Sequence, residues 1–554
     1  MFQSDVQHTG RHWSDWFRRL RAPKEPTEVL APYRRLKRSK VKIAFGLIGL
    51  MLFCFIYGFF FSVLAPNAFV FLMAPLVVLM FLVIWALPQS NWAPTRALEV
   101  LFYAMFIALI AWPNYLAIAL PGLPWITLIR LTSFPLLLIF LACISMSADV
   151  RSQLKQGWSS LPAIPTLLSI FVVIQLISIG LSKDVAGSIQ KFVVAQTTWT
   201  ASFFVALYVF REPGQIKKWA NILWAMAIFV ALIGLWEYRI QRLPWVGHIP
   251  GFLKIDAESV QHILIGNRRA GTNIYRTQST FSTPLGLAEY LALSLPFGLH
   301  FLTARFSGRT RIYAACSIPV VLYCCYLTDA KLGMVGSLAV LLVYGFWTAF
   351  QHWRRNKGSL VAASSLFSFF LAAGVLVAAL MFVHRFKILI LGDASHDNST
   401  AARVSQYTMG FQKLMEWPFG YGIGMGGDTL GFGRDMAGMI TIDTYYLSIV
   451  LEYGVLGFIV YYGMFAIAIF EGFKRLYLSP PKDDDRSFIL PLCVALVAFV
   501  IIKSVFSQQD NHPVVFMMLG ALVALCGRFR HPKRVSAPAF PHSASSMPAK
   551  TDFA

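Results

Sequence analysis

Long apolar runs constrain this chain more than any other feature. Runs such as 41–64 and 67–88 can each cross the hydrocarbon layer of a membrane, which takes roughly 20 helical residues. Backbone polar groups in lipid must be paired within their own segment, so these runs are predicted to be helices. Charged residues make up only 13% of the chain, too few to cover the surface of a soluble domain of this length. The sequence therefore predicts an all-α polytopic membrane protein.

About 14 runs reach spanning length. Their approximate extents are 41–64, 67–88, 98–120, 124–147, 164–182, 191–210, 218–237, 285–304, 311–327, 332–350, 360–384, 443–470, 487–506 and 513–527. Eleven Lys or Arg lie in the first 42 residues, and most other basic residues fall in every second short loop. Basic residues favour the cytoplasmic side, so both termini are predicted to be cytoplasmic.

Three parts of the chain follow from this topology. They are a basic cytoplasmic N-terminal segment (1–40), a transmembrane domain (41–530) and a flexible cytoplasmic tail (531–554). The formal net charge of +22 is distributed as topology signals and contacts with anionic lipids, so membrane lipids are expected partners and nucleic acid is not. All seven cysteines lie in apolar runs. Neither they nor the histidines show a metal-ligand spacing, so no metal and no cofactor is predicted.

Two predicted outer loops, about 238–284 and 385–442, are long and rich in arginine. Basic residues in exported loops oppose the topology signal, and long ordered loops are usually functional. The alternative is that long loops cross the membrane whatever their charge. We expect a functional role for some of these arginines.

The first outer loop ends with Arg276 a few residues before Pro284, which opens a predicted membrane helix. Ser and Thr residues before a proline can cap the free N–H groups of such a helix. A guanidinium beside a helix N-terminus also suits phosphate or diphosphate. Both interpretations remain open: an anion site, or a capped helix with an arginine among the headgroups.

The second outer loop contains a possible amphipathic helix over 400–416, predicted to lie along the membrane interface. A glycine-rich segment follows it at 420–427. This segment could let the backbone approach a ligand closely, or it could be a set of turns. No Lys-Ser/Thr follows it, so it is not a nucleotide-binding loop.

Asp443 opens the next membrane run, which continues to Gly454 and Gly457. Its carboxylate could cap the helix, which would lower its pKa, or it could act as a base at the membrane surface. The two glycines are predicted to allow close helix packing. Among intramembrane charges, Glu289 is expected to pair inside the bundle, and Lys503 to reach the interface near a helix end.

These stretches resemble the O-antigen ligase and O-antigen/exopolysaccharide polymerase superfamily over roughly 190–470. Three blocks carry the resemblance, in the order typical of that superfamily. They are Arg276-x-x-Ser-Thr-Phe-x-x-Pro284, Arg403 with Trp417-Pro418-x-Gly420-x-Gly422-x-Gly424, and Asp443-Thr444-x9-Gly454-x-x-Gly457. Asp443 stands where ligases have histidine, which favours a polymerase over a lipid A-core ligase. Lys331 stands near the position of an arginine in many relatives.

The resemblance implies a GT-C-like enzyme of the bacterial inner membrane. It would use a polyprenyl diphosphate-linked glycan as donor, without a metal, and invert the anomeric carbon. Asp443 would be the catalytic base, and the diphosphate or glycan would be bound by Arg276, Arg403, Arg268 and Lys331. Should Asp443 only cap the helix, His262 or His396 would be the next candidates.

The expected reaction is polymerisation of lipid-linked repeats for exopolysaccharide or O-antigen, with a flippase and a chain-length regulator as possible partners. One alternative is a ligase that passes the glycan to a lipid or another acceptor. A different class is a transporter or flippase for a lipid-linked glycan, which would line a central cavity with charges. The basic residues instead collect in the outer loops, which favours chemistry at the membrane surface.

Overall fold

The computed structural model describes residues 40–90, 93–119, 125–269, 273–304, 306–382, 394–431, 442–478, 484–505 and 508–528. The chain divides into two units, Met1–Leu72 and Met73–Ala554. The described part of the first unit is helical and belongs to α2 (Lys40–Trp85). The functional residues predicted from the sequence all lie in the second unit.

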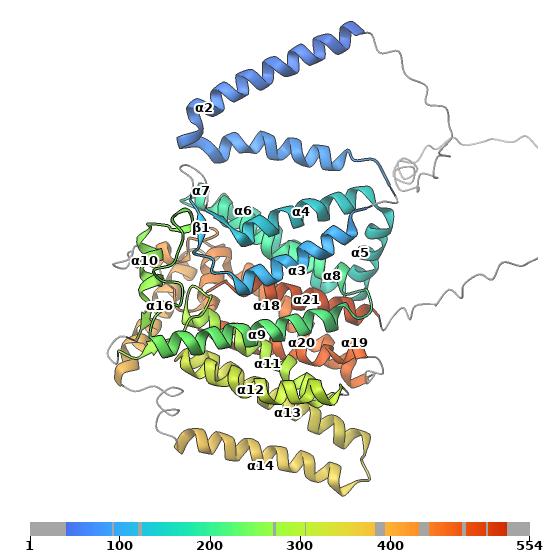
Figure 1. Ribbon diagram of the computed structural model, residues 1–554, viewed down its shortest axis with the longest axis vertical. Helices are drawn as coiled ribbons and strands as arrows, with labels where there is room; N and C mark the ends of the chain where they lie inside the picture. The colour runs from blue at the N-terminus through green and yellow to red at the C-terminus, as the bar shows by residue number, and fades with distance from the viewer. Residues whose placement is uncertain are drawn as a thin grey trace, which may run out of the picture. The chain divides into compact units, whose positions relative to one another are not determined.

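The regular secondary structure of the second unit is helical in its described residues, apart from two short strand pairs (Figure 1). Its first helices are α3 (Thr95–Ala111), α4 (Leu128–Met146), α5 (Ala148–Ser160), α6 (Ala163–Ile179), α7 (Val185–Ala195), the π-helix Gln196–Thr200, α8 (Ala201–Val209), α9 (Gln215–Ile240), the short 3₁₀ helix Gly251–Leu253 and α10 (Glu258–Ile265). They are followed by α11 (Pro284–Thr303), α12 (Gly308–Leu327), α13 (Lys331–Arg355), α14 (Leu360–Phe382), α16 (Ala394–Glu416), α17 (Gly426–Thr429), α18 (Tyr445–Leu478), α19 (Asp484–Ser487), α20 (Ile489–Lys503) and α21 (His512–Gly527). The antiparallel strand pairs are β1 (Ala117–Ile118) with β2 (Ile126–Thr127), and β3 (Asn267–Arg268) with β4 (Tyr275–Arg276).

Among the described residues, nine helices are long and apolar enough to span a membrane, or ten if the bent pair α5–α6 is one span. The multi-pass prediction is confirmed, and the number 14 stays a prediction. The predicted span 41–64 contains the apolar stretch Ala44–Phe61, which is long enough to cross a membrane, whereas in 67–88 the apolar helix Pro75–Trp85 is shorter. Other predicted spans form apolar helices that are shorter than a full span, such as His512–Gly527.

Helices α11 and α20 form the interior of the second unit. Most residues of both are buried, and α11 contacts α12, α13 and α20 directly. Close approach is possible where glycine faces a bulky neighbour, as Gly298 of α11 does against the ring of Trp224. The buried position of α11 matters for function because its N-terminus follows directly on the loop that carries Arg276.

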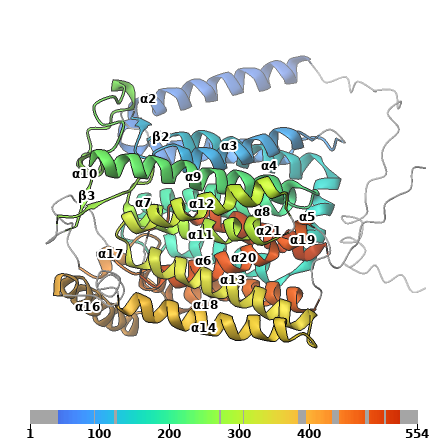
Figure 2. The same ribbon diagram turned by 60° about the horizontal axis from the view of Figure 1, so that its bottom comes forward.

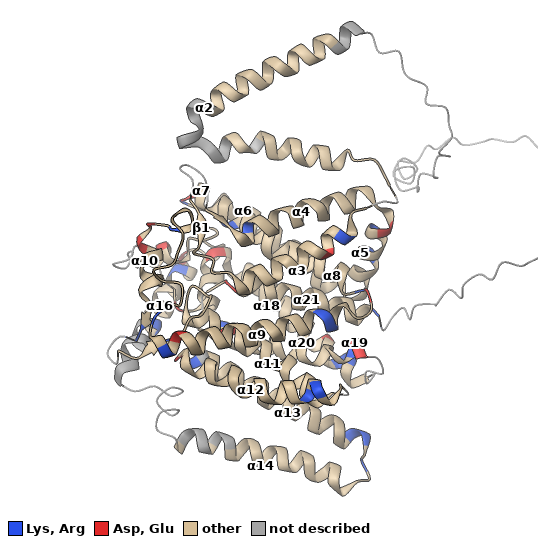
Figure 3. Ribbon diagram, in the orientation of Figure 1, with Lys and Arg blue, Asp and Glu red and all other residues tan. Residues whose placement is uncertain are grey.

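The two long loops lie at the same end of the second unit. Figures 1 and 2 both place α10, from the first loop, and α16, from the second, at one end of the helices, with α5 and α19 at the other. Figure 3 shows charged residues near both ends and mostly uncharged helices between them. This arrangement agrees with the predicted topology, in which both loops emerge on one side of the membrane.

Candidate functional site

The first outer loop returns to the membrane as the sequence predicted. Thr283 caps α11, because its hydroxyl accepts a hydrogen bond from the backbone N–H of Gly286 at 3.2 Å. Pro284 occupies the first helical position, where its missing N–H costs nothing. The cap expected from the Ser and Thr residues before Pro284 is therefore confirmed, and an anion site beside this helix end stays a prediction.

A carboxylate that the sequence analysis did not single out holds this segment. Glu237, in the last turn of α9, is fully buried and accepts hydrogen bonds from Gln278 N at 3.2 Å, Ser279 N at 2.6 Å and the Tyr275 hydroxyl at 2.8 Å. Ser279 has a φ of 53°, a left-handed conformation that non-glycine residues adopt only when their surroundings impose it. Glu237 thus holds the Tyr275 side chain before Arg276 and the backbone of Gln278 and Ser279 after it.

Arg276 lies against the turn between α12 and α13. Its Nε donates to the carbonyl oxygen of Thr328 at 3.2 Å, and nearby Arg269 forms an ion pair with Asp329 at 2.8 Å. Burial, and then the charge of Arg269, lower the pKa of Arg276 to about 10, so it keeps its charge near neutral pH. Asp329 is thus paired with Arg269, and among the described residues Arg276 itself forms no ion pair.

Lys331 and Arg268 are the other two basic residues predicted to bind the diphosphate or glycan near Arg276. Lys331 follows the turn along the chain, and Arg268 is the sequence neighbour of Arg269, which is paired with the turn. Lys331 is the first residue of α13, directly after the Thr328–Ala330 turn. Arg268 pairs with Tyr275 across the β3–β4 ladder and places its guanidinium 5.6 Å from the centre of that ring. Arg268 is exposed, and its neighbour Arg269 is the residue bonded to the turn. No signal in the sequence distinguished these two adjacent arginines.

Arg403 and Asp443 come together at the start of α18. Arg403 Nε lies 3.9 Å from a carboxylate oxygen of Asp443, and the backbone N–H of Asp443 donates to the side chain of Gln406 at 3.0 Å. Both Arg403 and Gln406 belong to α16, so this helix holds Asp443 by its side chain and its backbone. The structure therefore pairs the residues predicted as the base and as an anion ligand.

Asp443 does not occupy the capping position of α18. The helix begins at Tyr445, and the Thr444 carbonyl accepts the first helical hydrogen bond, from Ser448 N at 3.2 Å. Burial raises the pKa of Asp443 above its usual range, and the positive charge of Arg403 opposes this shift only in part. Capping would have lowered the pKa of Asp443, whereas burial raises it. A raised pKa favours a role as a base.

The glycine-rich segment packs against a break in α18. Gly454 has a φ of 71° and interrupts the helix, which leaves the carbonyl groups before it free to accept other bonds. Tyr421 N donates to Leu451 O at 2.7 Å, Gly422 N donates to the carbonyl of the next residue at 3.1 Å, and Val455 N donates to Pro418 O at 3.1 Å. Gly454 was expected to allow close helix packing, and it instead admits a second backbone into the helix.

A buried polar cluster lies beneath these segments. Lys503 of α20 forms an ion pair with Glu289 of α11 at 2.9 Å, and both side chains are almost completely buried. Asn511 donates to the same glutamate at 3.1 Å, and the Lys503 ammonium lies 5.4 Å from the centre of the Tyr445 ring. The expected pairing of Glu289 is confirmed. Lys503 does not reach the interface as predicted, because its partner lies inside the bundle.

Of the two alternative histidines, only His262 has a described side chain. His262 is half-exposed on α10, 3.9 Å from Glu258 of the same helix. The side chain of the other candidate, His396, lies outside the described residues. No group of three or more His, Cys, Asp or Glu side chains comes together within the described part of the chain.

Residues 316–462 match the family model described as O-Antigen ligase. The matched segment runs from within α12 into α18 and contains Lys331, Arg403 and Asp443. The chain therefore carries an O-antigen ligase-like domain in a multi-pass membrane protein, which confirms the resemblance to the ligase and polymerase superfamily. No curated protein sequence matches the chain.

Proposed function

We propose that this protein is a polysaccharide polymerase that joins polyprenyl diphosphate-linked oligosaccharide repeats on the outer face of the inner membrane. The observation that carries the proposal is the Arg403–Asp443 pair, 3.9 Å apart at the start of α18 and within the O-antigen ligase-like domain. It places a carboxylate of raised pKa next to a cation suited to a diphosphate.

In the proposed reaction Asp443 accepts the proton from a hydroxyl group of the acceptor sugar. The oxygen attacks the anomeric carbon of the donor and forms the new glycosidic bond. The bond from that carbon to the diphosphate breaks, and the lipid diphosphate leaves with the electron pair. Attack opposite the leaving group inverts the anomeric carbon. A base works best when its pKa approaches the working pH, so the burial of Asp443 assists this step.

The arginines stabilise the charge that develops on the leaving diphosphate. Arg276 and Arg269 lie beside one carboxylate, Asp329, so this corner carries excess positive charge. Fixed cations aimed at a growing negative charge stabilise the transition state more than the ground state. Arg403 adds a further cation at Asp443. Lys331 and the exposed Arg268 extend the basic surface toward the rest of the substrate.

The proposal is tested with Asp443→Asn and Arg276→Ala, after membrane insertion of each variant has been confirmed. Both should abolish high-molecular-weight polysaccharide and cause lipid-linked single repeats to accumulate. Asp428→Asn and Arg239→Ala are matched controls, because both residues are exposed and lie outside the proposed site. Normal polymer in both site variants would reject these catalytic assignments.

A ligase is the second candidate, because the matching family model carries that description. Both enzymes would use the same donor and the same base, so variants of Asp443 cannot separate them. The acceptor does: purified protein given only the lipid-linked repeat should lengthen it if it is a polymerase. A product that forms only when a different acceptor is added would identify a ligase.

A further inference from the structure

The turn between α20 and α21 is bonded to the start of α11. Residues 508–511 form the described part of this turn. The Ser282 hydroxyl donates to the carboxylate of Asp510 at 2.8 Å, and the side-chain amide of Asn511 donates to the carbonyl oxygen of Gly286 at 2.9 Å. The turn therefore holds the chain just before and just after the point where the first outer loop ends and α11 begins.

The carboxylate of Asp510 fits the start of α11 because Gly286 leaves room for it. A side chain at position 286 would place its Cβ atom 3.2 Å from a carboxylate oxygen of Asp510. The free N–H groups at a helix N-terminus also favour a negative charge nearby. Both features explain why a carboxylate of this turn packs against the first turn of α11.

The same turn contacts the start of α18 through His512, the first residue of α21. The His512 ring is completely buried. It stacks on the ring of Trp199 with their centres 4.6 Å apart, and it meets the ring of Tyr445 edge-on with their centres 4.8 Å apart. Tyr445 begins α18 and follows Asp443 by two residues. His512 therefore packs directly against the element that carries Asp443.

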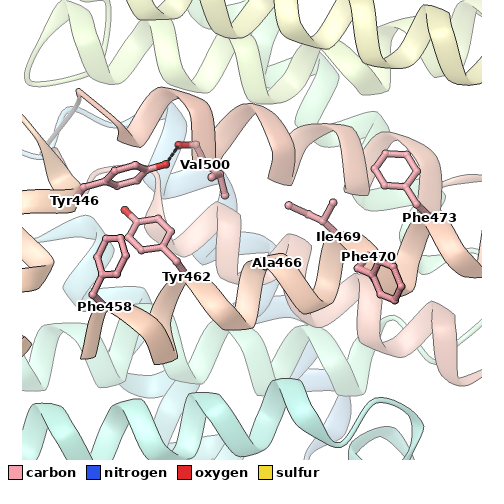
Figure 4. A pocket seen from close by; sticks show the side chains of 8 residues that line it. All are labelled: Tyr446, Phe458, Tyr462, Ala466, Ile469, Phe470, Phe473 and Val500. Atoms are coloured by element: carbon pink, nitrogen blue, oxygen red, sulfur yellow. Dashed lines mark hydrogen bonds between the residues drawn. The ribbon is translucent and has the colours of Figure 1, made fainter. Parts of the chain in front are cut away.

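Helix α20 also holds the start of α18. The Tyr446 hydroxyl donates to the carbonyl oxygen of Val500 at 2.7 Å, as Figure 4 shows. The rings of Tyr446 and Tyr462 have their centres 4.5 Å apart, whereas a straight helix would separate these residues by roughly 24 Å. The helix therefore folds back at Gly454, and its first residues pack against α20 and α21.

We propose that the turn between α20 and α21 sets the distance between Arg276 and Asp443, with Asp510 and His512 as its positioning residues. Asp510 acts on the Arg276 side, through the segment that leads into α11. His512 acts on the Asp443 side, through the first residue of α18. The inference rests on the proposed function, in which Arg276 stabilises the leaving diphosphate and Asp443 is the base.

Loss of either contact should impair the reaction more than the binding of the donor. The base and the cation act on opposite sides of one reacting carbon, and a misplacement of about 1 Å can cost about a hundredfold in rate. We therefore expect Asp510→Ala and His512→Ala to lower kcat about 10- to 100-fold. The KM for the lipid-linked donor should change less than about threefold, because the groups that bind it are still present.

Conservative variants should preserve both contacts and most of the wild-type kcat. Asp510→Asn keeps an oxygen that can accept the hydrogen bond from Ser282. His512→Phe keeps a flat ring beside Tyr445. Gln509→Ala is the matched control, since Gln509 is an exposed residue of the same turn.

The distance itself is measured by double electron–electron resonance between two spin labels on full-length protein in lipid bilayers. One label replaces Ile265, an exposed residue at the end of α10, next to the strand that pairs with β4. The other replaces Val404, an exposed residue of α16, the helix that contacts Asp443. The exposed cysteines Cys54 and Cys316 are first replaced by alanine so that they take no label.

The kcat and the distance should change together. The distance distribution should match that of the wild type in Gln509→Ala, and it should shift or broaden in Asp510→Ala and His512→Ala. A wild-type kcat in both alanine variants would overturn the inference, as would a lowered kcat with the wild-type distance distribution. Should His512→Ala fail to fold, Asp510→Ala and its comparison with Asp510→Asn decide the test.

Asp443→Asn separates this inference from the proposed function. Lost polymer in Asp443→Asn, together with a wild-type kcat and distance in the two alanine variants of the turn, rejects the positioning role alone. Normal polymer in Asp443→Asn, together with a shifted distance in those variants, rejects Asp443 as the base and leaves the control of the distance by the turn standing.

Discussion

Replacement of Glu237 by Gln is predicted to release the segment that carries Arg276. The carboxylate accepts three hydrogen bonds from two backbone N–H groups and the Tyr275 hydroxyl. An amide presents one acceptor oxygen and one NH₂ group, so at least one of these donors would face another donor inside the protein. The effect should be local, because the bonds join the end of α9 to residues 275–279 only.

The magnitude follows from the bonds that are lost. A hydrogen bond to a charged group contributes about 1.5–3 kcal/mol, and a buried donor left unpaired costs about 1–3 kcal/mol. These contributions overlap, so we expect Glu237→Gln to cost about 2–4 kcal/mol of local stability. At 1.4 kcal/mol per tenfold change, this is roughly a 30- to 1000-fold faster opening of the segment. Tyr275→Phe, which removes one bond of the three, should cost about 1 kcal/mol.

Hydrogen exchange measured by mass spectrometry in detergent reads this opening directly. Exchange should accelerate in 273–283 and stay unchanged in α11, because α11 is held by its own buried contacts. Glu258→Gln is the control, since Glu258 is an exposed carboxylate of the same outer loop. Transfer activity should fall with Arg276 displaced. Wild-type exchange of 273–283 in Glu237→Gln would refute the idea that this carboxylate positions the arginine.

Three further predictions concern the same end of the molecule. Lys503→Met leaves Glu289 buried without its ion-pair partner, so it should cost about 3–5 kcal/mol, and the double change with Glu289→Leu should recover much of that in thermal denaturation. Gly454→Ala should destabilise the protein and abolish activity, because a side chain at its positive φ would meet the backbone packed against it; intact activity would contradict this. Asp443 must be ionised to act as a base, and its pKa is raised above the usual range. The kcat should therefore increase as the pH rises through the pKa of Asp443. Arg403→Gln should move this rise to higher pH and Arg403→Lys should not, as a pH–rate profile of each variant would show.

The sequence predicted those parts of the site that depend on local chemistry. The cap at Thr283 follows from the Ser and Thr residues that precede a helical proline. The predicted amphipathic helix is present in α16, where Val404, Phe411 and Met415 are strongly exposed at helical spacing. Such features are visible because each needs only its neighbours along the chain.

The parts that were missed depend on contacts between distant segments. Glu237 lies at the outer end of a predicted membrane helix, where a glutamate is expected to reach water, and its partners are backbone N–H groups about 40 residues away. Almost every residue has a backbone N–H group, so the residue type does not show which of these groups will bind a buried carboxylate. Lys503 was misplaced for the same reason, because its partner Glu289 is more than 200 residues away and only the packing of α20 against α11 brings them together.

The glycine-containing segments of the second and third sequence blocks pack against each other in the structure. Pro418–Gly422 and the break at Gly454 share three backbone hydrogen bonds, so neither segment can shift without the other. The first segment directly follows α16, which carries Arg403, and the second interrupts the helix that follows Asp443. The backbone bonds therefore hold Arg403 and Asp443 in position, with their side chains 3.9 Å apart. These two side chains depend less on their own contacts to stay in place. This explains why glycine spacing and charged residues occur together in one motif: the glycines fix the distance at which the charges act.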